Sequence, residues 1–166
     1  SMHRTLFITN IKTPIVTSVK TSLSALLGAT ALLSLSLSTP VMADTFVITS
    51  GTTTNNGETI NGGDTVSVTG TIDTGTAGLE DGIETTGSNT IKVSTDGIIK
   101  TGGWFAIGIY NLGNTNTTTM SGSITTSGQY GYGILNAGDT NSTTMSGSIT
   151  TSGEIAYGIY NYGDSN

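Results

Sequence analysis

After position 43, apolar and polar residues alternate over short segments that end at glycine, asparagine or aspartate. In one stretch these segments are Thr117 to Met120, Ser123 to Ser127 and Tyr132 to Asn136. Thr, Ile, Val and Tyr favour strands, whereas Gly, Asn and Asp favour corners at which the backbone needs a positive φ. No part of this region has apolar residues at helical spacing over three turns, and both prolines precede it. The pattern predicts many short strands joined by tight corners.

The strand pattern repeats every 25 residues. Residues 117–141 and 142–166 align without gaps and are identical at 18 of 25 positions, and residues 92–116 keep the same glycine and isoleucine skeleton. A period of this length indicates a solenoid, a propeller or an array. Three strands and three corners in 25 residues fit one coil of a parallel β-helix, whereas a propeller blade needs about 40 to 45 residues and four strands. We therefore expect an all-β solenoid.

In a parallel β-helix, each strand pairs with its equivalent one coil away, so equivalent side chains stack in columns about 4.8 Å apart. Two core columns are expected: Ile99, Ile124 and Ile149 in one, and Ile109, Ile134 and Ile159 in the other. A third holds Met120 and Met145, with Thr95 as the counterpart one unit earlier. Stacked amides are expected to hydrogen-bond along an asparagine column of Asn111, Asn136 and Asn161.

The first 43 residues have a different character. Arg4, Lys12 and Lys20 precede an apolar stretch at 23–37, and no acid offsets their charge of +3. This stretch is shorter than the roughly 20 apolar residues that a membrane-spanning helix needs. Small or apolar residues follow at 41–43, as a signal peptidase requires, so residues 1–43 are expected to be a signal peptide, an apolar signal helix cleaved between Ala43 and Asp44.

The remaining 123 residues divide in two. Residues 44–68 depart from the period and are expected to cap the solenoid, and residues 69–166 are expected to form its coils. Two lysines against eleven acids give this part a net charge of −9, so nucleic acid is not an expected partner. Since the chain has no cysteine, backbone pairing and stacked side chains must stabilise it in place of disulfides.

Four sequence features resemble the passenger domains of bacterial autotransporters, adhesin-like proteins that cross the outer membrane through their own barrel. They are the basic leader ending in Val41-Met42-Ala43, the opening phrase at 57–66, the Gly-Ser-Ile-Thr-Thr-Ser-Gly phrase at 122–128 and 147–153, and the Gly-Ile phrase at 108, 133 and 158. The resemblance implies a right-handed parallel β-helix that is exported, and displayed on a Gram-negative outer membrane surface or secreted. It also implies further coils and a translocator barrel after Asn166.

Large side chains suggest where such a passenger binds. Tyr110, Leu135 and Tyr160 alternate with an isoleucine column and should point outward, with Leu112 and Tyr162 along the same face. An exposed stripe of this kind predicts a surface for a host protein or a glycan. Aromatic ladders also stabilise sheets that bind no ligand, so both interpretations stay open.

The alternative to a non-enzymatic adhesin is a secreted polysaccharide-acting β-helix enzyme. After position 43 there is no His or Arg, which excludes a Ser-His-Asp triad within this region. The nearest catalytic candidates are Glu80, Asp81 and Glu84, which a solvated corner also explains. No metal or cofactor is expected.

Other repeated residues suggest weaker hypotheses. An ice-binding surface would need unbroken threonine columns, and Lys100 interrupts the column of Thr125 and Thr150. Asp139 and Asp164 recur at one corner, where they are expected to be exposed turn residues. The triplets that begin at Asn116 and Asn141 match a glycosylation acceptor, but they recur because the unit recurs.

Overall fold

The structure is a computed structural model that describes residues 43–76 and 78–166. The expected signal peptide lies outside the described residues, except for Ala43 at its end. Every regular element in the described part is a β-strand, and no helix there is long and apolar enough to cross a membrane.

Fifteen strands form three five-stranded sheets in which all neighbours are parallel. Sheet A contains β1 (Thr45–Ile48), β4 (Thr65–Val68), β7 (Thr90–Val93), β10 (Thr117–Met120) and β13 (Ser142–Met145). Sheet B contains β2 (Thr53–Thr54), β5 (Thr71–Asp73), β8 (Ile98–Thr101), β11 (Ser123–Thr126) and β14 (Ser148–Thr151). Sheet C contains β3 (Glu58–Asn61), β6 (Ile83–Thr86), β9 (Ile109–Asn111), β12 (Ile134–Asn136) and β15 (Ile159–Asn161).

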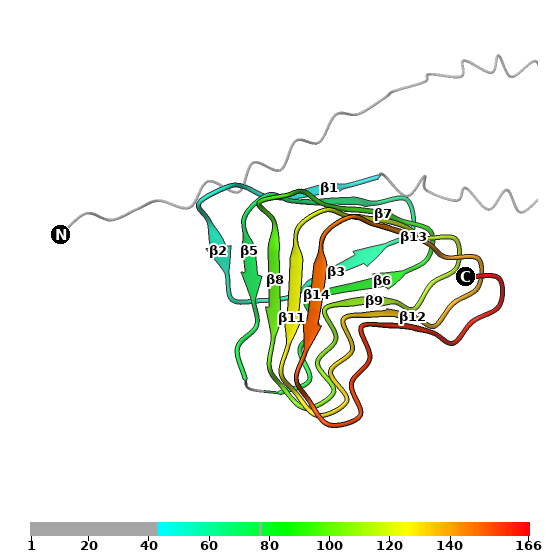
Figure 1. The fold of residues 1–166 in the computed structure, drawn as a ribbon. Coiled ribbons are helices and arrows are strands. Elements are labelled where there is room, and N and C mark those ends of the chain that lie inside the picture. Colours follow the sequence, from blue (N-terminus) through cyan, green and yellow to red (C-terminus); the bar gives the residue numbers. More distant parts are fainter. Residues whose placement is uncertain (1–42, 77) are drawn as a thin grey trace, which may run out of the picture. The chain divides into compact units, whose positions relative to one another are not determined.

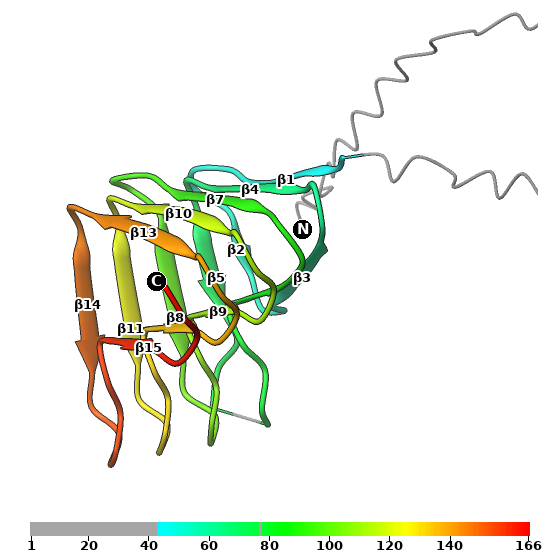
Figure 2. The same ribbon diagram turned by 90° about the vertical axis from the view of Figure 1, so that its right-hand side faces the viewer.

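The chain passes through sheets A, B and C in turn and then returns to sheet A, so one strand of each sheet makes up a coil (Figure 1). Successive coils stack side by side, as the turned view shows (Figure 2). The parallel β-helix predicted from the 25-residue period is confirmed. Residues 44–68 supply β1 to β4, so the segment expected to be a cap carries the end strand of every sheet.

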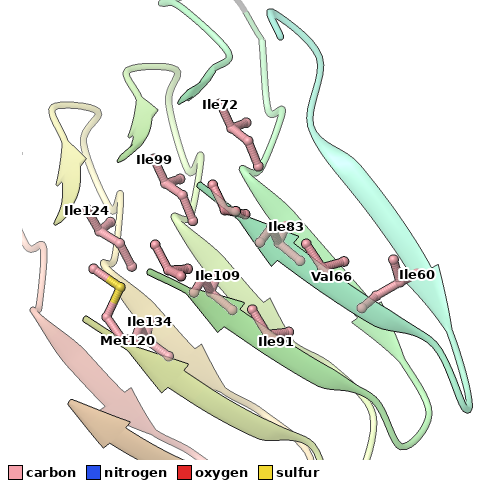
Figure 3. Packing of buried hydrophobic residues seen from close by; sticks show 12 residues of the cluster. Ile60, Val66, Ile72, Ile83, Ile91, Ile99, Ile109, Met120, Ile124 and Ile134 are labelled. Carbon is pink, nitrogen blue, oxygen red and sulfur yellow. The ribbon is translucent and has the colours of Figure 1, made fainter. Parts of the chain in front are cut away.

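Isoleucine columns fill the interior (Figure 3). Ile72, Ile99, Ile124 and Ile149 occupy one register position of sheet B, and Ile83, Ile109, Ile134 and Ile159 occupy one of sheet C. All of them except Ile149 and Ile159, which belong to the last coil, are at most 1% exposed. Since burying one isoleucine side chain stabilises a fold by roughly 1.5 to 3 kcal/mol, these columns are a principal source of stability.

The methionine column differs from the sequence prediction. Met120 pairs with Met145 on one side but with Val93 on the other, so the expected counterpart Thr95 is wrong. The corner between β7 and β8 has two more residues than the corner between β10 and β11. The extra residues leave the strand path in a turn closed by a 2.8 Å hydrogen bond from Gly97 N to Ser94 O. The two extra residues therefore do not shift the strands, and the apolar residue Val93 occupies the column of Met120 and Met145.

Polar residues take the place of isoleucine at the first coil. Thr54 lies in the register position of Ile72, and Glu58 lies in that of Ile83. Burial raises the pKa of the Glu58 carboxyl group. These two side chains place polar groups over the ends of both isoleucine columns.

Glycines recur where sheet C begins because two coils approach each other closely there. A Cβ atom added to Gly108 would lie 2.5 Å from the carbonyl oxygen of Gly133 and 2.5 Å from Cγ2 of Ile124. Real Cβ atoms do not come this close to such atoms, so the column Gly82, Gly108 and Gly133 excludes any side chain. The corner therefore packs directly against the isoleucine column of sheet B.

Two asparagine ladders run along the solenoid. The core ladder is the expected column of Asn111, Asn136 and Asn161, in which Nδ2 of each residue donates to Oδ1 of the next, at 2.7 and 2.8 Å. The corner ladder was not expected and precedes sheet A. It consists of Asp64, Asn89, Asn116, Asn141 and Asn166, in which each backbone N–H donates to Oδ1 of the next residue, at 2.7 to 3.1 Å.

Where the core ladder begins, threonine replaces isoleucine in the column that faces it. Its column holds Ile60 in β3 and Thr85 in β6 before it becomes asparagine. The facing column of sheet A changes from Ile91 in β7 to Thr118 in β10, the strand that follows Asn111. The second N–H of Asn111 donates to Oγ1 of Thr118 at 3.2 Å, and Asn136 repeats this contact with Thr143. The described residues contain no buried side-chain polar atom without a partner.

Candidate binding face

The outward side of sheet C carries one column of large side chains. Leu135 pairs with Tyr110 on one neighbouring strand and with Tyr160 on the other, and Glu84 precedes Tyr110 in the column. The alternating burial of β9 and β12, with Ile inside and Tyr or Leu half-buried, shows that these side chains face outward. The structure thus places Tyr110, Leu135 and Tyr160, three of the five residues named for the expected stripe, in one column.

Tyr162 lies apart from this column. It follows the last residue of β15 and is 74% exposed, and within the described residues its ring contacts no other aromatic ring. Leu112 has the same place after β9 and is also exposed. Both side chains belong to the corner that leads back to sheet A.

A second column lies beside the first and contains Tyr132 and Tyr157. The ring of Tyr132 lies 5.6 Å from Tyr157 and 5.5 Å from Tyr160, and the rings of Tyr157 and Tyr160 are stacked at 5.4 Å. Burial and the neighbouring tyrosines raise the pKa of Tyr132. We call Tyr132, Tyr157 and Tyr160 the tyrosine cluster. Offset and tilted rings at these distances attract each other, so the cluster is held in place by its own contacts.

The corner between sheets B and C carries a second aromatic group. Trp104, Phe105 and Tyr130 contact one another with ring centroids 5.1 to 6.3 Å apart, and Trp104 is 56% exposed. Phe105, Tyr130 and Ile155 all have a positive φ, between 58° and 64°. Bulky side chains rarely adopt this left-handed conformation, which costs roughly 1 to 2 kcal/mol per residue. The corner therefore presents large side chains at positions where glycine would be less strained.

The charges beside these rings are all negative. Burial raises the pKa of Tyr110, and the carboxylates of Asp81 and Glu84 raise it further. Glu154 lies in the corner next to Tyr130 and accepts a side-chain hydrogen bond from Gln129. The two lysines of the described region face outward on other sheets, Lys92 on sheet A and Lys100 on sheet B. The face thus combines exposed rings with carboxylates.

The acidic residues Glu80, Asp81 and Glu84 line a small surface depression of about 150 Å³ together with Glu58. Oε1 of Glu80 accepts the backbone N–H of Gly57 at 2.8 Å, and Oδ1 of Asp81 accepts that of Ile107 at 2.6 Å. Burial raises the pKa of Asp81 to about 6, against the opposing effect of this hydrogen bond. Both carboxylates therefore link neighbouring coils, and the described residues contain no group of acids that could hold a metal ion.

The other repeated polar residues also serve the corners. Asp164 donates its backbone N–H to Oδ1 of Asp139 at 2.9 Å, and both residues are exposed. Asn116 and Asn141 are at most 2% exposed within the corner ladder. An asparagine side chain buried in this way cannot accept a glycan in the folded chain, so the two acceptor triplets are structural.

Sequence reasoning missed the tyrosine cluster and the aromatic corner. Tyr132 was expected to begin a strand, but that strand begins at Ile134, and Tyr132 lies in the corner before it. The spacing of 25 residues between Tyr132 and Tyr157 was a signal for a second column. Phe105 and Tyr130 are also 25 residues apart, which was a signal for a column in this corner, whereas Trp104 has Gln129 at that spacing, so only the fold brings Trp104 to Tyr130.

The expected cleavage point lies at the start of the described residues. Asp44 precedes β1, and its carbonyl oxygen accepts the backbone N–H of Thr65 at 2.9 Å. The first residue after the expected cleavage is therefore already part of sheet A pairing. Comparisons with family models, with curated proteins and with solved structures found no match to this chain.

Proposed function

We propose that the chain is part of an exported, non-enzymatic surface protein in which the β-solenoid is a stalk that displays a binding face. The observation that carries this proposal is the tyrosine cluster, whose three rings lie at the outer side of sheet C and hold one another in place. Aromatic rings held in this way stack against the apolar faces of sugars and against protein side chains. The ligand class is therefore a glycan or a protein of a host surface, and the role is adhesion.

The repeated architecture supports the same proposal. Each coil adds one outward residue to each column at a fixed spacing, so a longer array would present several weak contacts together. Several linked weak contacts give a much higher overall affinity than any one of them. The basic leader and the resemblance to autotransporter passengers support export to the cell surface of a Gram-negative bacterium, with a translocator barrel further along the chain.

Binding of the full chain to panels of host matrix proteins and glycans tests this function. Tyr157→Ser should reduce binding at least tenfold, because it removes a ring that contacts both other members of the cluster. Tyr162→Ser is the matched control, since Tyr162 is also exposed and makes no aromatic contact in the described region. Equal binding by both variants, or no binding to either panel by the unmodified chain, would contradict the proposal.

One observation favours a polysaccharide-acting enzyme as a second candidate. Asp81 has a pKa near 6 and lies with Glu84 beside the acidic depression, as a general acid would. This candidate predicts cleavage of an acidic or neutral polysaccharide, with loss of activity in Asp81→Asn or Glu80→Gln. Absence of sugar cleavage by the full chain over several polysaccharides would exclude it.

A further inference from the structure

One residue of the corner ladder differs in charge from all the others. The four asparagines from Asn89 to Asn166 are neutral, whereas the first residue is Asp64. The N–H that Asp64 accepts comes from Asp44, whose backbone nitrogen lies 2.9 Å from Oδ1. The single carboxylate of the ladder thus faces the residue that is expected to become the N-terminus.

Elsewhere in the corner ladder, a neutral asparagine oxygen accepts the backbone N–H of the neighbouring coil. Oδ1 of Asn141 accepts from Asn116 N at 2.8 Å, and Nδ2 of Asn141 donates to the carbonyl oxygen of Gly138, three residues earlier. The side chain of Asp64 has no N–H to donate, and its second oxygen accepts the backbone N–H of Asn61 at 3.0 Å. The turn therefore accommodates a carboxylate at position 64. A neutral N–H at position 44 does not require a carboxylate there, because an asparagine oxygen could accept it equally well.

The carboxylate of Asp64 is also well removed from water, because the residue is only 6% exposed. Burying a carboxylate is unfavourable unless it is hydrogen-bonded and paired with a positive charge. Two backbone N–H groups supply hydrogen bonds, and neither lysine of the described region lies in this ladder. A positive charge at the Asp44 nitrogen would complete the site.

We propose that Asp64 binds the N-terminal ammonium group of Asp44 that cleavage after Ala43 creates. Hydrolysis of this peptide bond adds the hydroxyl of water to the Ala43 carbonyl carbon and leaves the amine on Asp44, which takes up a proton at neutral pH. An unperturbed α-amino group has a pKa of about 7.7 to 8.0, so it is mostly charged at pH 7. The hydrogen bond at 2.9 Å, in which the carboxylate accepts a neutral N–H, then becomes an ion pair between two opposite charges.

The ion pair would fix the start of the solenoid. Asp44 O accepts Thr65 N at 2.9 Å, and the next residues pair β1 with β4. An unpaired, charged terminus would instead compete for water and fray the first strand. Removal of the leader therefore converts an ordinary ladder contact into a charged anchor for sheet A. The inference depends on the export proposed above, but it does not depend on what the solenoid binds.

The test uses the full chain exported from a Gram-negative host and processed there. Mass spectrometry of the product should give Asp44 as its first residue. The rate at which acetic anhydride acylates the α-amine is then measured at pH 7, with Lys92 and Lys100 of the same molecule as internal references. We expect Asp64→Asn to raise the rate at Asp44 about tenfold relative to the lysines, and to lower the thermal midpoint of unfolding by roughly 4 °C or more.

A second variant keeps the test decisive if Asp64→Asn does not fold. A chain released by an inserted protease site so that it begins at Ala43 keeps Asp64 but moves the amine one residue away. Its α-amine should react as fast as an exposed terminus. A product that begins elsewhere than Asp44, or an α-amine that reacts equally fast in the unmodified protein and in the variants, would overturn the inference. Binding to host ligands plays no part in these readouts, so failure here is distinct from failure of the proposed adhesion.

Discussion

The side-chain amide of Asn111 donates to the side-chain oxygen of Asn136 across 2.7 Å in the interior of the solenoid. The second N–H groups of Asn111 and Asn136 donate to the Oγ1 atoms of Thr118 and Thr143. A buried amide is tolerated only when its groups are paired, so the asparagine and threonine columns depend on each other.

Replacement of Asn136 by leucine should lower the free energy of unfolding by about 2 to 4 kcal/mol, because it leaves the amides of Asn111 and Asn161 without their partner. Thr143→Val alone should lower the free energy of unfolding by about 1 kcal/mol. The loss of unfolding free energy in the double variant should be about 0.5 to 2 kcal/mol smaller than the sum of the two single losses, since a leucine at position 136 has no N–H for the Thr143 hydroxyl to accept. Denaturant unfolding of the four proteins measures the coupling, and strictly additive costs would show that the two columns are independent.

The glycine column gives a second prediction. Gly108→Ala should destabilise the protein by about 3 kcal/mol, because its methyl group would overlap the carbonyl oxygen of Gly133 and Ile124. Gly158→Ala is the control in the same column, since an added Cβ there would meet only Cγ2 of Ile149 at an ordinary 3.9 Å. In thermal and denaturant unfolding, the stability of Gly108→Ala should be far lower than that of Gly158→Ala. Similar losses in both would mean that the corner adjusts freely.

Asp81 predicts a specific dependence of stability on pH. Burial is the main reason that its pKa rises from 3.8 to about 6 in the folded chain. The folded state therefore binds more protons than the unfolded state between these values, and this group's contribution to stability falls as pH rises from about 4 to 6. Asp81→Asn keeps an acceptor for the Ile107 N–H and should stabilise the protein at pH 7 but not at pH 4.

The control for this prediction is Asp96→Asn, which removes one negative charge from an exposed corner. If general repulsion among the acids caused the pH dependence, both variants would flatten the stability profile equally. Only Asp81→Asn is expected to reduce the change between pH 4 and pH 6, in unfolding experiments at matched ionic strength, and the raised pKa of Glu58 accounts for part of the change that stays.

The left-handed corner residues give a further prediction. Ile155 is β-branched, has a φ of 58° and is 52% exposed, so its conformation costs free energy that little packing offsets. Ile155→Asn should raise the free energy of unfolding by about 1 kcal/mol, since asparagine tolerates this region. Val47→Asn, at an equally exposed strand position, should lower it. A loss of stability at position 155 would mean that the isoleucine side chain packs in solution.

The fold could be predicted because the period fixes the register. With equivalent residues 25 apart, strand pairing follows directly, and the columns of Ile124 and Ile134 follow from the pairing. The counterpart of Met120 could not be predicted in this way, because a gapless alignment hides the longer corner after β7. The same insertion displaces Asn89 from Asn116 by 27 residues, which conceals the corner ladder.

The binding face was predicted only in part for a different reason. Strand alternation correctly places Tyr110 and Tyr160 outward, but it says nothing of side chains in corners. Tyr132 and Tyr157 reach Tyr160 through the path of the corner before sheet C, and no periodicity specifies that path. In the aromatic corner, Phe105 recurs as Tyr130 at the same period, but Trp104 has no aromatic counterpart, so only three-dimensional packing places it against both rings.

The longer corner at 94–97 shows that the solenoid tolerates changes of length where the chain turns, while the strands on either side keep their partners. Units 117–141 and 142–166 are identical at 18 of 25 positions, so each presents nearly the same side chains to its neighbours. Insertion or deletion of one such unit would add or remove one whole coil, and the flanking coils would meet nearly the same side chains as before. The reach of the solenoid would then change in steps of one strand spacing, about 4.8 Å, while the pairing of the other strands is preserved.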